Sequence, residues 1–139
     1  MENITTILIV FITVGLVFSS GCIDNTKANN TWGEKKISLD AIKISDNTTG
    51  NHSEGNESIY YVYGYIDNNN PYEALNIKMN VTTYTSNGTV FAFNDTPYLE
   101  LNNIPANGEI YFYAGFSDPN KKIAKYEVKI LDAKAEYWT

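Results

Sequence analysis

Tyrosines are concentrated in two short stretches of this 139-residue chain. Residues 58–68 read SIYYVYGYIDN, and residues 109–116 read EIYFYAGF. Alternate side chains of a β-strand point to opposite faces of its sheet. Tyr61, Tyr63 and Tyr65 would therefore share one face, and Tyr111 and Tyr113 would join them if the two strands are neighbours. Such an array suits a sugar or another sheet, because aromatic rings contact apolar C–H groups while hydroxyls form hydrogen bonds at the edge.

The same tyrosines have a purely structural interpretation. Aromatic pairs that face each other across neighbouring strands stabilise a sheet by about 0.2–1 kcal/mol each. The polar segment that precedes the strands could also cover the rings. Large exposed aromatic patches, in contrast, often mark interaction surfaces. Both interpretations stay open at the level of sequence, and the exposure of the five rings distinguishes them.

Few other residues suggest chemistry. The only histidine, His52, lies in a Gly- and Asn-rich stretch and is expected to be exposed rather than catalytic. The sequence has no Ser–His–Asp set, no His or Cys cluster with metal-ligand spacing and no glycine-rich phosphate loop. The prediction is a protein that is not an enzyme and has no cofactor.

A calcium site is the one metal hypothesis that the sequence raises, because hard oxygen ligands are what Ca²⁺ prefers. The spacing lacks the glycine and the terminal glutamate of an EF-hand loop, so solvated turn residues are the favoured interpretation. The candidate ligands are Asp67, Asn69 and Glu73, with Asp118 and Asn120 as possible additions.

The first 21 residues are typical of a lipoprotein signal peptide. Residues 7–18 read ILIVFITVGLVF and are followed by SSGC, an apolar run and then small residues. Ser20, Gly21 and Cys22 resemble the lipobox of prokaryotic lipoproteins, which implies cleavage before Cys22 and lipidation of its thiol. Ser19 stands where the lipobox prefers Leu, and the leader has no Lys or Arg. The alternative is an uncleaved hydrophobic anchor helix in which Cys22 is unmodified. Both place the remaining chain outside the cytoplasm, at the cell surface.

Beyond Cys22, the tripeptide Asn-x-Ser/Thr occurs seven times, about three times as often as composition predicts. This tripeptide is the acceptor for N-glycosylation in secreted proteins. Combined with a lipobox, it would indicate an archaeal cell envelope. Asn-rich composition with local clustering is the alternative explanation. The candidate sites are Asn29, Asn47, Asn51, Asn56, Asn80, Asn87 and Asn94.

Charge excludes one class of partner. The chain has ten lysines, no arginine and a formal net charge of -6. Neutralising phosphates requires a basic patch, so nucleic acid is not an expected partner. The expected partners are the membrane, through the N-terminal lipid or hydrophobic segment, and an envelope glycan or protein.

Beyond the leader, the pattern predicts a polar tether over residues 22–34 and an all-β domain over residues 35–139. Period-two alternation appears in about seven short segments, with turns between them: residues 36–45, 60–66, 75–85, 89–93, 98–101, 109–116 and 123–131. Residues 46–57 are expected to form a loop, and Asn87-Gly88 a hairpin turn. The fold class predicted is an antiparallel, immunoglobulin-like two-sheet sandwich. With one cysteine, no intrachain disulfide can form.

From Tyr61 onward, the chain resembles the FxLYD domain, a small β-sandwich module of prokaryotic secreted and surface proteins. The matching residues are 62–68 (VYGYIDN), the amphipathic strand 75–84, residues 87–90 (NGTV), Ile104-Pro105 with Gly108, Phe112, and residues 126–130 (YEVKI). Thr85 departs from the family, which commonly has Asp there. The resemblance implies a fold and a surface location, and it carries no catalytic residues. It also agrees with Val62, Gly64 and Ile66 facing the core, with Gly64 leaving room for a large residue such as Phe112.

Overall fold

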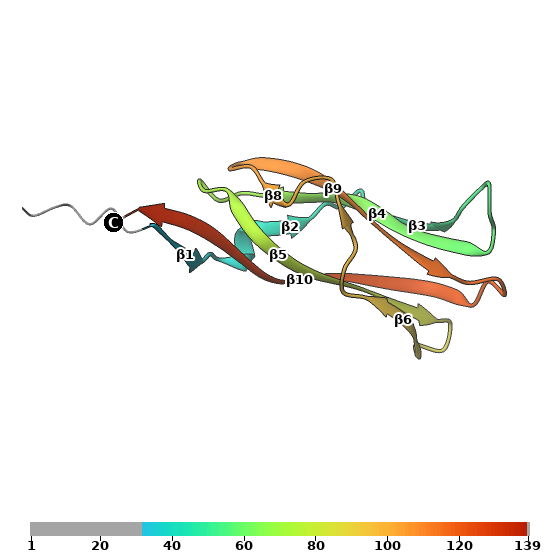
Figure 1. The fold of residues 1–139 in the computed structure, drawn as a ribbon. Helices are drawn as coiled ribbons and strands as arrows, with labels where there is room; N and C mark the ends of the chain where they lie inside the picture. Colours follow the sequence, from blue (N-terminus) through green and yellow to red (C-terminus); the bar gives the residue numbers. More distant parts are fainter. Residues whose placement is uncertain (1–31, 139) are drawn as a thin grey trace, which may run out of the picture. The chain divides into compact units, whose positions relative to one another are not determined.

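Alternating apolar and polar residues build two antiparallel β-sheets in the computed structural model, which describes residues 32–138 (Figure 1). The first sheet has the order β2-β4-β9-β7, and β3 also pairs with β4. Its strands are β2 (Ile42–Ile44), β3 (Thr49–His52), β4 (Ile59–Asn68), β7 (Tyr98–Leu99) and β9 (Gly108–Ser117). The chain is therefore all-β in its described part, apart from one short 3-10 helix, η1 (Leu39–Ala41).

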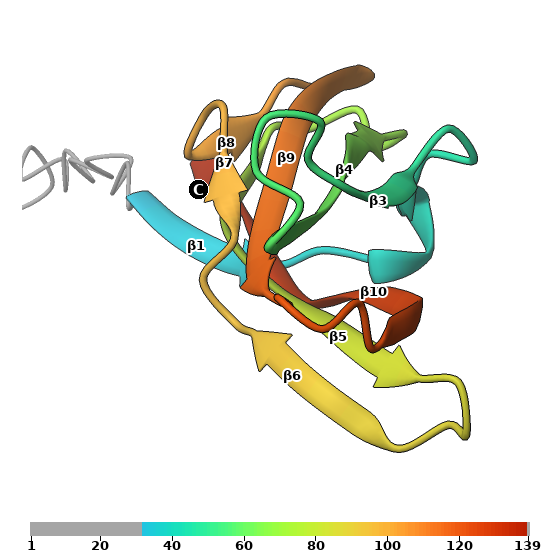
Figure 2. The ribbon, with the colours of Figure 1, turned by 90° about the vertical axis from the view of Figure 1, so that its right-hand side faces the viewer.

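The second sheet has the order β1-β10-β5-β6, and β8 also pairs with β5. Its strands are β1 (Trp32–Lys36), β5 (Ala74–Thr85), β6 (Val90–Asn94), β8 (Asn103–Ile104) and β10 (Ile123–Trp138). Figures 1 and 2 show β4 and β9 in one layer and β5 and β10 in the other. The two antiparallel layers are those expected of a β-sandwich.

The core lies between the two sheets and is made of the apolar side of each long strand. β4 and β9 contribute Tyr60, Val62, Ile66, Ile110, Phe112, Ala114 and Phe116, and the second sheet contributes Ala74, Met79, Val81, Ile104, Ile123 and Ala133. The burial along β4 and β9 follows the period-two alternation that the sequence predicts. One side of each strand is closed by the core, and the odd-numbered tyrosines are on the other.

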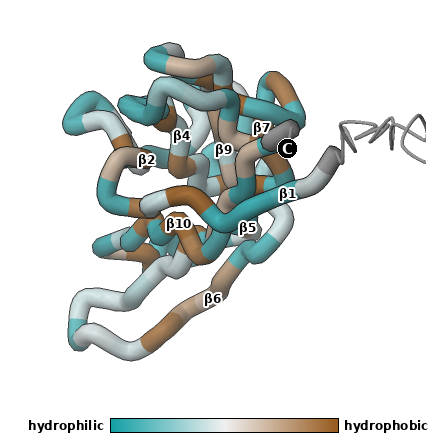
Figure 3. The backbone as a smooth tube through the Cα atoms, turned by 90° about the vertical axis from the view of Figure 1, so that its left-hand side faces the viewer, coloured by the Kyte–Doolittle hydropathy of each residue, from teal (hydrophilic) through white to brown (hydrophobic). Residues whose placement is uncertain are grey.

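In β5 and β10, alternate residues face the core over most of the length, and then the inward-facing set shifts by one residue. In β10, Tyr126, Val128 and Ile130 pack against the core, and Lys125, Glu127 and Lys129 are exposed. Hydrophobic stretches of β10 are visible in Figure 3. Near Asn76, which has φ = 50°, the register between the strands shifts. A bulge inserts an extra residue and reverses which side chains face inward. Alternation over residues 75–85 predicts that Leu75 shares the core side with Ile77, Met79 and Val81. This prediction was wrong because of the bulge, and Ala74 is buried instead of Leu75.

The turn between β5 and β6 lies at the predicted Asn87-Gly88. The N–H of Gly88 donates to the carbonyl of Thr85 at 2.9 Å, and only Gly88 has a positive φ, 84°. Both central residues of a two-residue type I′ hairpin have positive φ, so this turn is a longer type that ends in a left-handed glycine. The position of the turn was predicted correctly, and Asn87 keeps an ordinary φ.

The N-terminal part of the domain differs most from expectation. Residues 36–45, where alternation with one change of phase predicts a single strand with a bulge, do not form one strand, because η1 separates β1 from β2. β1 begins at Trp32, before the expected domain start at residue 35, and pairs with the end of β10. The predicted loop 46–57 contains β3, which pairs with β4. β3 reads TGNH, and such a polar strand has no apolar alternation to reveal it.

Gly64 does make room for another residue, but that residue is Thr48 and not Phe112. A Cβ added at Gly64 would lie 2.4 Å from Oγ1 of Thr48 and 2.9 Å from its Cα. The Thr48 carbonyl accepts a hydrogen bond from the Tyr126 hydroxyl at 2.7 Å, which ties the β2–β3 turn to the second sheet. Phe112 is the cross-strand partner of Gly64 and is buried in the core.

Residues 32–138 contain no helix that is long and apolar enough to cross a membrane. The predicted signal segment, Cys22 and Asn29 lie outside the described residues.

Candidate functional site

The five tyrosines singled out in the sequence lie together on the outer side of the first sheet. β4 and β9 pair directly, with Tyr63 opposite Tyr113, Tyr65 opposite Tyr111 and Tyr61 opposite Gly115. Directly opposite side chains on one face of an antiparallel pair have Cβ atoms about 4.5–5.5 Å apart. The register therefore converts two separate sequence stretches into one aromatic surface.

A sixth tyrosine, which sequence reasoning missed, extends this surface onto β7. Tyr98 is the cross-strand partner of Tyr113 on the side away from β4, and its ring stacks on Tyr113 with centroids 4.7 Å apart and planes at 27°. β7 has only two residues, so it shows no alternation that could assign a face. The six residues are called the tyrosine face below: Tyr61, Tyr63, Tyr65, Tyr98, Tyr111 and Tyr113.

The rings pack edge to face as well as stacked. Tyr61 meets Tyr113 with centroids 6.2 Å apart at 73°, and Tyr65 meets Tyr111 at 5.6 Å and 67°. These distances and angles are in the favourable range for aromatic pairs. Tyr65, Tyr98 and Tyr113 nevertheless remain 42%, 50% and 39% exposed. The rings support one another and are still open to solvent within the described domain.

Two hollows adjoin on the tyrosine face, with Tyr61 and Tyr113 lining both. The first has a volume of about 370 Å³ and is also lined by Asn51, Tyr63 and Tyr111. The second has a volume of about 590 Å³ and extends along β9 over Gly115 to Ser117 and, on the β4 side, to Asn56 and Ser58. Small-molecule sites typically have volumes of about 300–1,000 Å³. Each hollow is thus large enough for a small ring-shaped group.

The hollows are lined by neutral polar and aromatic groups and by no charged side chain. The Asn51 amide donates to the Tyr63 hydroxyl at 3.4 Å. Burial, and to a lesser degree the neighbouring hydroxyls of Tyr63, Tyr65 and Tyr113, raise the pKa of Tyr111. Like any tyrosine hydroxyl, this group is protonated at neutral pH, so it can both donate and accept a hydrogen bond.

The outer side of the second sheet is different in character. β5 and β10 place Asn80, Thr82 and Tyr84 opposite Lys129, Glu127 and Lys125. Glu127 accepts from the Tyr84 hydroxyl at 3.0 Å and pairs with Lys129 at 2.9 Å. This charged, hydrogen-bonded surface is what a solvated sheet normally presents. This side also carries Tyr84 and the exposed Phe93, which is opposite Thr82, but the contiguous array of aromatic rings lies on the first sheet.

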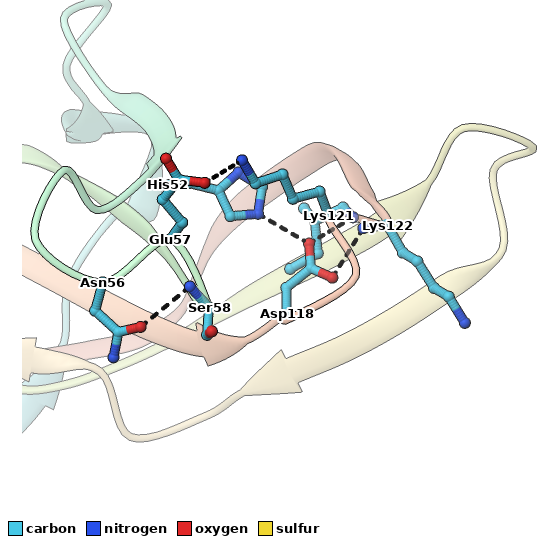
Figure 4. A network of polar contacts seen from close by, with 8 residues as sticks. His52, Asn56, Glu57, Ser58, Asp118, Lys121 and Lys122 are labelled. Carbon is cyan, nitrogen blue, oxygen red and sulfur yellow. Dashed lines mark hydrogen bonds and ion pairs between the residues drawn. The ribbon is translucent and has the colours of Figure 1, made fainter.

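His52 is not exposed as predicted. It ends β3 half-buried, with Nε2 3.1 Å from Oδ2 of Asp118 and its ring edge-on to Tyr60 at 5.1 Å (Figure 4). Burial acts to raise the pKa of Asp118, but the backbone N–H groups of Ile123 and Lys122, together with His52, outweigh it and lower that pKa. The carboxylate is ionised and anchors the β9–β10 turn.

This His–Asp pair does not form a catalytic triad with any described residue. The carboxylate oxygens of Asp118 accept the backbone N–H groups of Lys122 and Ile123, at 2.8 and 2.9 Å, and contact His52 at 3.1 Å. No serine, threonine or cysteine side chain in residues 32–138 is hydrogen-bonded to the His52 ring. The arrangement connects β3 to the turn, and its chemistry is structural.

The calcium hypothesis is not supported by the positions of its candidate ligands. Asp118 is bound to the β9–β10 turn, and Glu73 accepts from Asn103 near β8. Asp67 lies in the β2–β4–β9 ladder between Lys43 and Glu109. Among the described residues, no group of three or more His, Cys, Asp or Glu side chains could hold a metal ion.

Six of the seven Asn-x-Ser/Thr sites beyond Cys22 lie in the described part of the chain. In three of them the asparagine oxygen accepts the backbone N–H two residues later, at 2.9–3.1 Å: Asn56, Asn87 and Asn94. Such turns favour asparagine for conformational reasons alone, which agrees with the compositional explanation. Asn51 and Asn56 have a special position, because each lines one hollow of the tyrosine face.

Comparison of the chain with protein-family models, with curated proteins and with solved structures found no match. The resemblance to the FxLYD domain therefore stays a prediction.

Proposed function

We propose that the chain is a membrane-anchored module outside the cytoplasm that binds an envelope glycan or protein through the tyrosine face. The observation that carries this proposal is the contiguity of six tyrosines on one sheet, of which Tyr65, Tyr98 and Tyr113 are exposed to solvent, beside a second sheet whose outer side carries charged residues. Tyrosine is enriched at recognition surfaces because its ring is rigid and apolar while its hydroxyl forms hydrogen bonds.

The proposed cellular location of the module rests on the N-terminal sequence alone. We propose that residues 1–21 are a lipoprotein-type signal peptide, that Cys22 is lipidated and that residues 22–31 form a tether. The two-sheet architecture is compatible with an immunoglobulin-like sandwich of FxLYD type in an archaeal envelope, and this finer assignment is part of the proposal. A binding role, and not an enzymatic one, is in keeping with the structural engagement of His52 and Asp118.

The second candidate is a spacer of the cell envelope that is glycosylated and has no dedicated ligand. The ring-on-ring contacts of Tyr61, Tyr113 and Tyr111 favour it, because such pairs stabilise a sheet whether or not anything binds. The two candidates differ in what the hydroxyls do. A spacer needs the rings alone, whereas a binding face also needs the hydrogen-bonding rim.

Two triple variants separate the candidates. Replacing Tyr61, Tyr63 and Tyr113 with Ala should abolish co-sedimentation of the detergent-solubilised full chain with envelope fragments from which the membrane lipid has been extracted, so that the N-terminal anchor cannot contribute to binding. Replacing the same three residues with Phe keeps the rings, and should weaken co-sedimentation while the melting temperature changes little. Tyr72→Ala and Tyr84→Ala are matched controls, because neither tyrosine lines the hollows. Unaltered co-sedimentation of both triple variants, with only a lower melting temperature for the Ala variant, would favour the spacer.

A further inference from the structure

We infer that the ligand of the tyrosine face is an uncharged oligosaccharide, and that the two hollows are adjacent subsites for successive sugar units. This inference rests on the proposed binding function and specifies its ligand. It comes from the composition of the hollows, from their common wall and from the placement of the nearest charged groups.

The composition of the hollows fits a saccharide better than a protein partner. The rings of Tyr61 and Tyr113 supply apolar surface for the C–H faces of a sugar. The polar atoms around them are hydroxyls and amides, from Tyr63, Tyr111 and Asn51 in the first hollow. In the second hollow, the hydroxyls of Ser58 and Ser117 and the amide of Asn56 supply the polar atoms. A sugar unit presents hydroxyls at its rim and apolar C–H groups on its faces, and this arrangement matches both features.

The absence of charge from both linings selects an uncharged ligand. Acidic sugars and phosphorylated glycans are normally recognised by Arg or Lys, because a charged group left without a partner loses its hydration at a large cost. Charged residues near the hollows are already paired or hydrogen-bonded. Glu100 accepts the N–H of Tyr111 at 3.2 Å, and Glu57 pairs with Lys121 at 2.5 Å. Lys43, Asp67 and Glu109 are cross-strand neighbours in the ladder beyond Tyr65 and Tyr111. A cationic glycan would likewise find no carboxylate in the described lining of either hollow.

The shared wall makes the hollows successive subsites along one chain. Tyr61 and Tyr113 line both hollows, so a ligand that fills the first can continue past this pair into the second. The second hollow runs along β9 toward Ser117. Gly115 has no side chain, and this lets the Tyr61 ring lie against β9, with Cε1 3.1 Å from the position that a Cβ of residue 115 would take. A second unit bound by the same molecule costs little additional loss of translational freedom, so affinity should rise with chain length.

The test is a length series on the full chain, solubilised in a detergent that has no sugar headgroup. Cello-, manno- and chito-oligosaccharides of one to six units are titrated by calorimetry. At least one series should show an affinity that rises tenfold or more between one and three units and then levels off. Oligogalacturonates of the same lengths, which are acidic, should bind at least tenfold more weakly. An affinity that does not depend on length, or equal binding of the acidic series, would overturn the inference.

Ser117→Leu tests the second subsite alone. Ser117 is exposed at the end of β9 and lines only the second hollow, so a leucine there fills that hollow without touching the core. The variant should bind a single sugar unit as the wild type does and lose the gain from additional units. Ser86→Leu makes the same exchange at an exposed position in the β5–β6 turn and should leave the length dependence unchanged. Loss of the length dependence in both variants, or in neither, would contradict adjacent subsites.

Failure of this inference can be distinguished from failure of the binding function. If wild-type protein co-sediments with envelope fragments, the Ala triple variant does not, and no neutral oligosaccharide competes, the tyrosine face binds something else and the saccharide assignment is wrong. If neither protein co-sediments and no oligosaccharide binds, both proposals are wrong.

Discussion

Asp118 is buried at the turn between β9 and β10, and Oδ2 of its carboxylate lies 3.1 Å from Nε2 of His52. The carboxylate also accepts the backbone N–H groups of Lys122 and Ile123. An ionised carboxylate can only accept hydrogen bonds, so Nε2 carries the hydrogen. The contact joins residues 66 positions apart in the sequence and holds β3 against the turn that connects the two sheets.

Asp118→Asn should destabilise the domain. The amide has the shape of the carboxylate, but its NH₂ group would replace one of the two oxygens. That NH₂ group would face the N–H of Lys122, or the N–H of Ile123 together with His52, and none of these donors could bond to it. A buried donor left without a partner costs about 1–3 kcal/mol. We expect a loss of this size in the free energy of unfolding, measured with urea. Glu57→Gln is the control, because Glu57 pairs with Lys121 on the exposed side of the same turn and its replacement should cause no measurable change. An equal loss in both variants would contradict the special role of the buried carboxylate.

The same contact predicts a stability that falls in acid. The pKa of Asp118 is lower in the folded chain than its ordinary value of 3.8. Protons therefore bind more readily to the unfolded chain, and the contribution of Asp118 is complete above pH 3.8 and is lost as the pH falls through the folded pKa. The difference in free energy of unfolding between wild type and Asp118→Asn should be constant from neutral pH to about pH 5 and shrink below pH 4. A difference that stays constant down to pH 2 would show that the carboxylate is not the titrating group.

The two-sheet architecture was predictable because each long strand buries one side. On β4, the buried Val62 and Ile66 are four residues apart, and on β9 the buried residues, among them Phe112, recur every second position. The positions of the five tyrosines on one outer side follow from the same parity once β4 and β9 are neighbours. Alternation fails where a bulge adds a residue, as it does near Asn76.

The remaining features depend on partners distant in sequence, for which no local pattern exists. β3 is polar, so its side chains show no alternation from which a strand could be predicted. Its strand conformation depends on backbone pairing with β4. Tyr98 occupies a two-residue strand whose face is set by Tyr113. The burial of His52 depends on Asp118. A sequence that shows only periodicity predicts the layers of such a domain more readily than the details of its surface.

A glycan attached to Asn51 would lie beside the proposed ligand site. The amide nitrogen of Asn51, the atom to which an N-linked glycan is attached, lies 3.4 Å from the Tyr63 hydroxyl and at the edge of the first hollow. A glycan on Asn51 would therefore occupy the space that the proposed ligand needs. Protein that carries this glycan should bind oligosaccharide at least tenfold more weakly than protein without it. Glycopeptide mass spectrometry establishes occupancy, and calorimetry measures the affinity.

Ser53→Ala removes the Asn51 glycosylation site without changing Asn51 itself. The backbone N–H of Ser53 still donates to the Ile59 carbonyl, so the β3–β4 connection is retained. In a host that glycosylates Asn51, this variant should bind more tightly than the wild type, and in a host that does not, the two should be equal. Thr96→Ala is the matched control, because it removes the site at Asn94, which lines neither hollow. Equal binding by Asn51-glycosylated protein and Ser53→Ala would show that ligand and glycan do not compete.

Gly64→Ala should destabilise the domain although glycine is unfavourable within strands in general. The new methyl group would lie 2.4 Å from Oγ1 and 2.9 Å from Cα of Thr48, and the second of these is backbone that cannot rotate away. Overpacking of this kind costs about 1–3 kcal/mol. The Tyr126 hydroxyl bond to the Thr48 carbonyl should be lost as the turn moves. Gly55→Ala is the matched control, since nothing lies within 4 Å of its added Cβ. Urea unfolding of both variants measures the difference, and equal stability of Gly64→Ala and wild type would mean that the β2–β3 turn does not pack against β4 at this position.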